Sequence, residues 1–84
     1  MTLSKQPPII QADISVDARQ QHCPMPLLKT KQALNRIRAG EIVEVLATDS
    51  GSWRDIPLFV AKCQHQLLLA EQTENFYRYC IKKG

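Results

Sequence analysis

The most reactive group that this sequence offers is the thiol of Cys23, which opens the run Cys23-Pro24-Met25-Pro26. Pro24 suits the first position of a helix, because the N–H that proline lacks has no intrahelical partner there. We therefore expect a helix with Cys23 as its N-cap, and with the sulfur facing the N–H groups of Met25 and Leu27. Such N–H groups stabilise a thiolate and can lower a cysteine pKa from about 8.5 into the range of ~3.5–7.5.

The residues before Cys23 bear on whether its side chain is exposed. Residues 19–22 read Arg-Gln-Gln-His, a polar flank that argues against burial. His22 could add positive charge beside the sulfur when protonated, although we interpret it as a solvated loop residue. A competing interpretation makes Cys23 a small buried residue that merely precedes a proline-rich helix start. The sequence favours an exposed Cys23, and this is the one catalytic residue that we predict.

The remaining cysteines are expected to have other roles. An odd count of three cysteines, with no C-x-x-C pair and no Cys/His cluster of zinc spacing, predicts neither a disulfide framework nor a metal site. Cys63 falls on the apolar stripe of a predicted helix, so we expect it in the core. Cys80 alternates with Arg78 and Lys82, which places it on the more polar face of a strand, where it could be an exposed spare thiol. His65 is interpreted as a turn residue.

The sequence lacks the motifs of several cysteine-dependent and phosphate-binding reactions, which limits the reactions that Cys23 could perform. No Asp/His pair is evident to complete a hydrolytic cysteine triad, and no glycine-rich loop could cradle a phosphate. No cofactor is expected. A lone activated cysteine suits reactions that need no general base, such as thiol exchange and persulfide relay. In such a relay a thiolate attacks the terminal sulfur of a donor's persulfide, takes that sulfur and passes it to an acceptor.

The elements that must position Cys23 follow from the hydrophobic periodicity. The 84 residues suffice for one small domain, which we place at 10–84 after a flexible leader at 1–9. Apolar residues alternate with polar ones over 10–17, which predicts a half-buried strand. The helix that follows Cys23 is expected to stop at Gly40, and a β-branched run predicts a strand at 41–47.

The second half of the chain is predicted to hold one helix and two strands. Ser52 with Asp55 resembles a capping box for the helix, whereas Pro57 favours Asp55 as the cap, and the sequence leaves both open. Strands are predicted at 66–71 and 75–82, joined by 72–74 as an antiparallel hairpin. The expected fold is an α/β (α+β) two-layer sandwich of order β-α-β-α-β-β, with two helices on one face of a four-stranded mixed sheet.

Composition and charge exclude some classes of function. The net charge is +3 and the basic residues are scattered, which is weak support for nucleic-acid binding. No apolar run approaches the ~18 residues of a membrane span, and the N-terminus is not a signal peptide, so we expect a cytoplasmic protein with no membrane contact. An RNA-binding module would need exposed aromatics on a basic face, and the candidates are Trp53, Tyr77 and Tyr79, of which the tyrosines are expected to pack. The basic residues that could steer the chain to acidic partners are Arg19, Lys29, Arg36, Arg38 and Arg54.

Six short motifs stand in a recognisable order along the chain. They are Asp17-Ala18, Cys23-Pro24-Met25-Pro26, Gly40-Glu41, Thr48-Asp49, Arg54-Asp55-Ile56-Pro57-x-Phe59 and the closing run YRYCIKKG at 77–84. Together they resemble the TusA/SirA-like sulfur-carrier family from about residue 12 to the end. The resemblance implies the same two-layer fold. It also implies a sulfurtransferase whose Cys23 accepts persulfide sulfur from a cysteine desulfurase and relays it to an acceptor protein for tRNA wobble-uridine 2-thiolation, with tRNA contacted only indirectly.

The chain departs from that family just before the cysteine. The family usually has Gly-Leu where this sequence has Gln20-Gln21. The glycine permits a special backbone conformation and the leucine packs, so their replacement could alter the path of the loop or the choice of partner. Two alternatives therefore stay open. One is sulfur trafficking in thiosulfate or sulfur oxidation or in cofactor biosynthesis, and the other is a non-catalytic regulatory or RNA-binding module.

Overall fold

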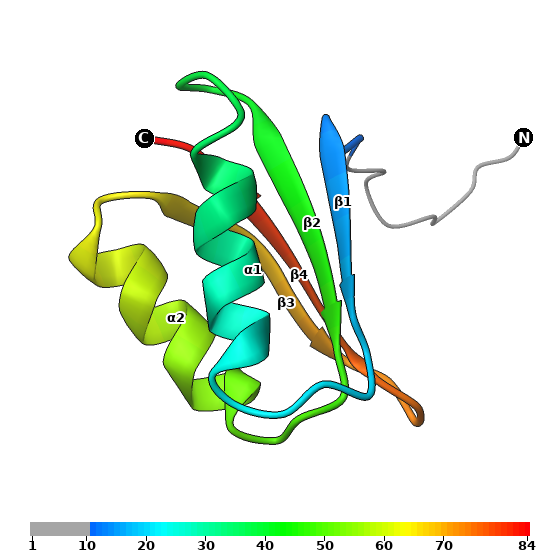
Figure 1. Ribbon diagram of the computed structural model, residues 1–84. Helices are drawn as coiled ribbons and strands as arrows, with labels where there is room; N and C mark the ends of the chain where they lie inside the picture. The colour runs from blue at the N-terminus through cyan, green and yellow to red at the C-terminus, as the bar shows by residue number, and fades with distance from the viewer. Residues whose placement is uncertain (1–10) are drawn as a thin grey trace, which may run out of the picture.

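Residues 11–84 of the chain are described by a computed structural model, in which two helices cover one face of a four-stranded sheet (Figure 1). The leader predicted at 1–9 and the strand start predicted at residue 10 lie outside the described residues. The helices are α1, Met25–Leu34, and α2, Ser52–Lys62. The strands are β1, Ile14–Ala18; β2, Ile42–Ala47; β3, Gln66–Gln72; and β4, Tyr77–Lys82. The predicted element order and the two-layer sandwich are confirmed.

The sheet is mixed and its strands follow the order β1-β2-β4-β3. β1 and β2 are parallel, with Ile14 opposite Val43, and α1 forms the crossover between them. β4 lies between β2 and β3 and is antiparallel to both. The hairpin predicted for the last two strands is therefore confirmed. Its register shifts between Leu67 and Leu69, where one extra residue on β3 forms a bulge.

The core lies between the sheet and the two helices. Alternate residues of each strand point to the same face, so Val43 and Val45 of β2 lie beside Tyr79 and Ile81 of β4 on the helix-covered face. All four are fully buried. The helices contribute Ala33, Leu34, Ile56 and Val60 to this core. The packing fixes both helix axes against the sheet, and it therefore fixes the place where each helix begins.

The helix boundaries differ from the expected ones at two points. α1 ends at Leu34 with Asn35 as its C-cap, well before Gly40, because the chain turns there before it enters β2. Gly40 has a φ of +93° and lies in that later turn. α2 begins at Ser52 with Gly51 as its N-cap and without a side-chain cap, so both predicted caps, Ser52 and Asp55, are wrong. Pro57 lies inside the helix.

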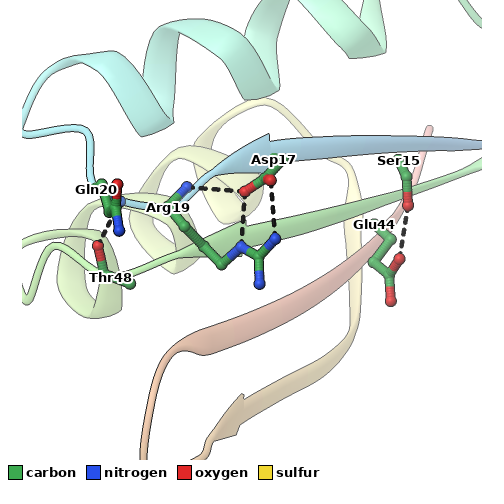
Figure 2. Close-up of polar contacts among 6 residues, drawn as sticks. All are labelled: Ser15, Asp17, Arg19, Gln20, Glu44 and Thr48. Atoms are coloured by element: carbon green, nitrogen blue, oxygen red, sulfur yellow. Dashed lines mark hydrogen bonds and ion pairs between the residues drawn. The ribbon is translucent and has the colours of Figure 1, made fainter.

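The face of the sheet without helices carries a row of polar contacts across all four strands. Ser15 Oγ donates to Glu44 Oε1 at 2.6 Å (Figure 2), and the guanidinium of Arg78 pairs with the other oxygen of Glu44. Arg78 Nη1 also lies 3.6 Å from Glu71 Oε1. Cys80 belongs to this face, since it stands opposite Glu44 in the register and alternates with the core residues of β4.

Three connections gather at one end of the sheet, at the bottom of Figure 1: β1–α1, β2–α2 and β3–β4. The carboxyl ends of the parallel strands β1 and β2 both lie there, which is why the two loops that lead into the helices are neighbours. Within residues 11–84, no helix combines the length and the apolar character needed to cross a membrane.

Candidate functional site

Cys23 lies in the β1–α1 connection at this end of the sheet, two residues before α1 begins. The residue is exposed, as the sequence predicts. Its thiol borders a small hollow of about 10 Å³, which both helix-leading loops and both helix starts enclose. The lining residues are Cys23, Pro24, Pro26, Leu27, Asp49, Ser52 and Asp55.

The nearest polar partner of the thiol is a carboxylate from α2. Cys23 Sγ lies 3.7 Å from Asp55 Oδ2, within reach of an S–H···O hydrogen bond in which the thiol donates. The other oxygen of the same carboxylate, Oδ1, lies 3.3 Å from Nε of Arg54. The side chain of Arg54 is mostly in solvent, so its charge is screened by water. Asp55 thus joins the thiol to α2.

The predicted N-cap role of Cys23 is wrong. The N-cap of α1 is Pro24, whose carbonyl accepts from the Leu28 N–H at 3.0 Å. The N–H of Met25 donates to the carbonyl of His22 at 2.8 Å and is not directed at the sulfur. The peptide bond between Cys23 and Pro24 is cis, and the hydrogen-bond partner of the sulfur among residues 11–84 is the carboxylate of Asp55. The thiol therefore lacks the backbone donors that the sequence seemed to supply.

The electrostatics of the site oppose ionisation of the thiol, which reverses the expected direction. The pKa of Cys23 is raised above its ordinary value, first by partial desolvation of the sulfur and next by the charge and hydrogen bond of Asp55. Asp49 raises this pKa further, while Arg54 lowers it. Cys23 is exposed as a residue, while its sulfur borders the hollow and is partly desolvated there. Cys23 is accordingly held as a neutral thiol.

Ser52, which lines the hollow, belongs to a buried pair of hydroxyl groups. Ser52 Oγ donates to the carbonyl of Asp49 at 2.8 Å, so the Tyr79 hydroxyl is the donor in the 2.8 Å contact between Tyr79 and Ser52. Both residues are buried. The contact ties the start of α2 to the middle of the sheet. Sequence patterns assign Ser52 only to a turn or a cap, and no signal in the chain reveals that Tyr79 reaches it.

The loop before Cys23 is held by Gln20, where the backbone is left-handed. Gln20 has a φ of +65°, a conformation that glycine adopts easily and that most other residues adopt at a cost. Its N–H donates to Thr48 Oγ1 at 2.7 Å, which links the loop to the end of β2 (Figure 2). Gln20 thus has a left-handed backbone at the position where the resembling family usually has glycine. Beside it, Gln21 Oε1 is buried with no hydrogen-bond partner among residues 11–84.

The other predicted site residues fall in different places. His22 is solvated as expected, with a side chain 91% exposed and Nδ1 4.0 Å from Asp49 Oδ1. Cys63 is exposed at the C-cap of α2, so its predicted core position is wrong. Cys80 is buried beneath its polar neighbours on the open sheet face, so its predicted exposure is wrong as well. His65 lies between α2 and β3 as expected, and its Nδ1 accepts from the N–H of Gly84 at 3.0 Å.

The aromatic candidates are not arranged for stacking on nucleic-acid bases. Tyr79 is fully buried and Tyr77 is partly buried, as the sequence predicts. Trp53 is 42% exposed, but its ring packs against Tyr77 with centroids 5.5 Å apart. In the same described part of the chain, residues 11–84, no group of three or more His, Cys, Asp or Glu side chains could hold a metal ion. The site therefore offers a single exposed thiol with carboxylates beside it.

Comparison with known proteins decides the family. The family model for sulfurtransferase TusA matches residues 14–83. The chain belongs to the sulfurtransferase TusA family. A sulfur-transfer role follows at the level of the family, and sulfur carriers recur among the relatives.

Individual relatives agree with this family. The sulfur carrier protein TusA of Allochromatium vinosum is 32% identical over 72 residues, covering 86% of this chain and 95% of that protein. A provisionally named sulfur carrier protein of Archaeoglobus fulgidus is 40% identical over 70 residues, covering 83% of this chain and 96% of that protein. The crystal structure of a SirA-like protein from Desulfitobacterium hafniense superposes with a TM-score of 0.74 at 28% identity, covering 84% of this chain and 97% of that one. The TusA-family fold and the observed sheet topology thus agree.

Proposed function

We propose that Cys23 carries sulfur as a persulfide, which it accepts from a cysteine desulfurase and hands to a downstream relay protein. The observation that carries the proposal is the exposed thiol of Cys23 in the loop between β1 and α1, at the end of the sheet where three connections meet. A protein donor can approach a thiol in this position, and access governs the rate of thiol exchange.

The transfer step balances without a further reactant. The sulfur of Cys23 attacks the terminal sulfur of the donor's persulfide, R–S–SH, and forms a new S–S bond. The old S–S bond breaks, and its electron pair goes to the donor's inner sulfur. The proton that Cys23 loses ends on that departing sulfur, so Cys–SH and R–S–SH become Cys–S–SH and R–SH. Delivery repeats the same exchange, with the loaded carrier as the donor.

The final destination that the family resemblance favours is 2-thiolation of the wobble uridine of certain tRNAs. In this role the carrier meets proteins on both sides of the relay, and tRNA is contacted only by a later component. The pyridoxal phosphate that such relays use belongs to the desulfurase, and no cofactor is assigned to this chain.

The loading step is tested by mass spectrometry of the full chain after incubation with a cysteine desulfurase and cysteine. We expect one added sulfur on the wild type and on Cys63→Ser, and none on Cys23→Ser. Cys63→Ser is the matched control, because it removes an equally exposed thiol elsewhere on the surface. Sulfur retained on Cys23→Ser would refute the assignment.

The destination needs a separate experiment in cells. Deletion of the gene should lower the 2-thiouridine content of tRNA, and wild-type chain should restore it where Cys23→Ser does not. Normal 2-thiolation in the deletion strain, with a defect in sulfur oxidation or cofactor synthesis instead, would redirect the relay while leaving Cys23 as the carrier.

A further inference from the structure

The hollow beside Cys23 is charged in one sense only. Among its lining residues the charged side chains are Asp49 and Asp55, which we call the acidic pair. Both carboxylates come from the segment that leads into and begins α2, and Asp55 Oδ2 contacts the sulfur at 3.7 Å. A positively charged site would favour the thiolate and make the thiol more reactive. This hollow instead places two carboxylates beside the sulfur.

We propose that the acidic pair holds Cys23 as a neutral, weakly nucleophilic thiol in the free protein, and that a cationic group on the docking sulfur donor offsets the pair during transfer. The inference rests on the proposed function, because it concerns the regulation of the same thiol. It assigns Asp55 and Asp49 as positioning residues, which act through Cys23.

The geometry of the contact between Cys23 and Asp55 favours the neutral thiol. A thiol donates its proton to Asp55 Oδ2, whereas a thiolate at the same place would set two negative charges 3.7 Å apart. Ionisation therefore loses a hydrogen bond and gains a repulsion, and both effects favour the protonated form. Asp49, on the same hollow, adds its field in the same direction.

Three cations lie near the acidic pair, and none of them lines the hollow. Arg54, on α2, contacts Asp55 through Oδ1, the oxygen that the thiol does not use, and its side chain is 79% exposed. His22, in the β1–α1 connection, lies 4.0 Å from Asp49 Oδ1 with a side chain 91% exposed. From α1, Lys31 shares with Asp55 a groove on the other side of Leu27. These cations stand outside the hollow, and the sulfur is left facing carboxylates.

The chemistry of sulfur transfer explains why a cation of the donor would be needed. The proton on Cys23 must leave during attack on the donor persulfide, and it ends on the departing sulfur of the donor. A cation of the donor placed against Asp55 or Asp49 removes the repulsion that opposes the transient negative charge on the Cys23 sulfur. Reactivity then depends on the presence of the partner, and unpartnered carrier is spared from alkylation and oxidation.

The test measures the pKa of Cys23 through the pH dependence of iodoacetamide alkylation, in a Cys63→Ser background so that one exposed thiol remains. We expect Asp55→Asn to lower the midpoint and to speed alkylation at neutral pH about threefold, which corresponds to a fall of roughly half a pKa unit. Asp49→Asn should act in the same direction and less strongly. Glu41→Gln, at the opposite end of β2, is the matched control and should leave the midpoint unchanged.

An unchanged or raised midpoint in Asp55→Asn, with a native circular dichroism spectrum, would overturn the inference. The asparagine keeps the shape of the side chain, so a merely structural role for Asp55 predicts no shift in the midpoint. Alkylation does not require a donor protein. A lowered midpoint together with a Cys23 that never takes up sulfur would therefore refute the proposed function and leave the effect of the acidic pair standing.

The partner's cation is tested by loading from the cysteine desulfurase. Asp55→Asn should load more slowly at low donor concentration although it alkylates faster, because the donor's cation has lost its counter-charge. Added salt should slow loading of the wild type more than loading of the variant. Loading that speeds up in parallel with alkylation, with the salt dependence unchanged, would show that no cation of the donor meets the pair.

Discussion

Carboxylates have different hydrogen-bond partners in two regions of the molecule. One region is the face of the sheet without helices, which we call the open face, and the other is the end of the sheet that carries Cys23. On the open face each acid is satisfied by a donor. The hydrogen bonds from Arg19 (Figure 2) hold the pKa of Asp17 at about 2. The hydrogen bonds from Ser15 and Arg78 lower the pKa of Glu44. At the Cys23 end, Asp55 instead accepts from a thiol, and the thiol pKa rises. Carboxylates thus bind cationic or hydroxyl donors on the open face and raise the pKa of a thiol at the Cys23 end.

The two regions also hold two contrasting thiols. Cys80 lies on the open face, fully buried, and burial raises its pKa. The pKa of Cys23 is raised as well, yet its residue is exposed. The direction of the pKa shift therefore does not distinguish the thiol of the proposed site from the buried thiol of Cys80, whereas solvent access does. The comparison gives four predictions, which follow in order of expected size.

The largest difference is in the labelling of the three cysteines. Under native conditions a maleimide should modify Cys23 and Cys63 and leave Cys80 unmodified, because Cys80 has no accessible surface until the sheet opens. Peptide mass spectrometry after short exposure, with and without denaturant, measures this. Native labelling of Cys80 at the rate of Cys63 would break the distinction between a buried and an accessible thiol.

The next effect concerns the buried hydroxyl pair of Ser52 and Tyr79. Ser52→Ala leaves the buried Tyr79 hydroxyl without its partner and should lower the free energy of unfolding by about 1–3 kcal/mol. Tyr79→Phe should cost less, because Ser52 keeps its bond to the Asp49 carbonyl. Urea denaturation of both variants measures the order. A greater loss in Tyr79→Phe than in Ser52→Ala would contradict the hydrogen-bond directions.

The polar row on the open face should show a pH-dependent contribution to stability. The pKa of Glu44 is lower in the folded chain than its ordinary value of 4.5, so its contribution is present above that value and is lost as the pH falls through the folded pKa. Glu44→Gln should therefore cost about 1 kcal/mol at neutral pH, and the difference from wild type should shrink in acid.

Urea denaturation at several pH values measures this difference. Glu74→Gln, which removes an exposed carboxylate from the β3–β4 connection, is the control and should be near neutral at every pH. An equal loss of stability for Glu44→Gln at acidic and neutral pH would show that charge plays no part in the polar row.

The smallest effect lies in the loop before Cys23. Gln20→Gly removes the cost of a left-handed backbone at a residue with a side chain, and it should raise the free energy of unfolding by roughly 0.5–1 kcal/mol. Gln20→Ala, which keeps a Cβ, is the matched comparison and should bring no such gain. Thermal denaturation resolves the pair. Equal stabilities for the glycine and alanine variants would mean that the loop relaxes out of this conformation.

The element order and the fold were predictable from the sequence, because periods of two and of about 3.6 residues alternate along the chain and each is a local property. The left-handed backbone at Gln20 was not predicted for this chain, because its sequence has a side chain where the resembling family usually has glycine. The helix boundaries were less predictable, because α2 accommodates Pro57 within a helix whose start is fixed by the buried contact of Ser52.

The electrostatics of the site could not be predicted, because they depend on distant parts of the chain. Asp55 stands 32 residues after Cys23 and meets it only because β1 and β2 are parallel neighbours. The misplaced cysteines have similar causes. The apolar stripe that ends in Cys63 continues past the last turn of α2, and the polar residues near Cys80 in the sequence cover it in the folded sheet.

The hollow beside Cys23 measures about 10 Å³, close to the space that a single water molecule needs. An added sulfur atom therefore finds no compartment behind the thiol and must project into the solvent. Under the proposed function, the added sulfur is therefore not enclosed by the protein, and free reductants compete with the acceptor protein for it. The cell would then regulate the flow of sulfur through the supply of acceptors, and the loaded form would be short-lived whenever those acceptors are scarce.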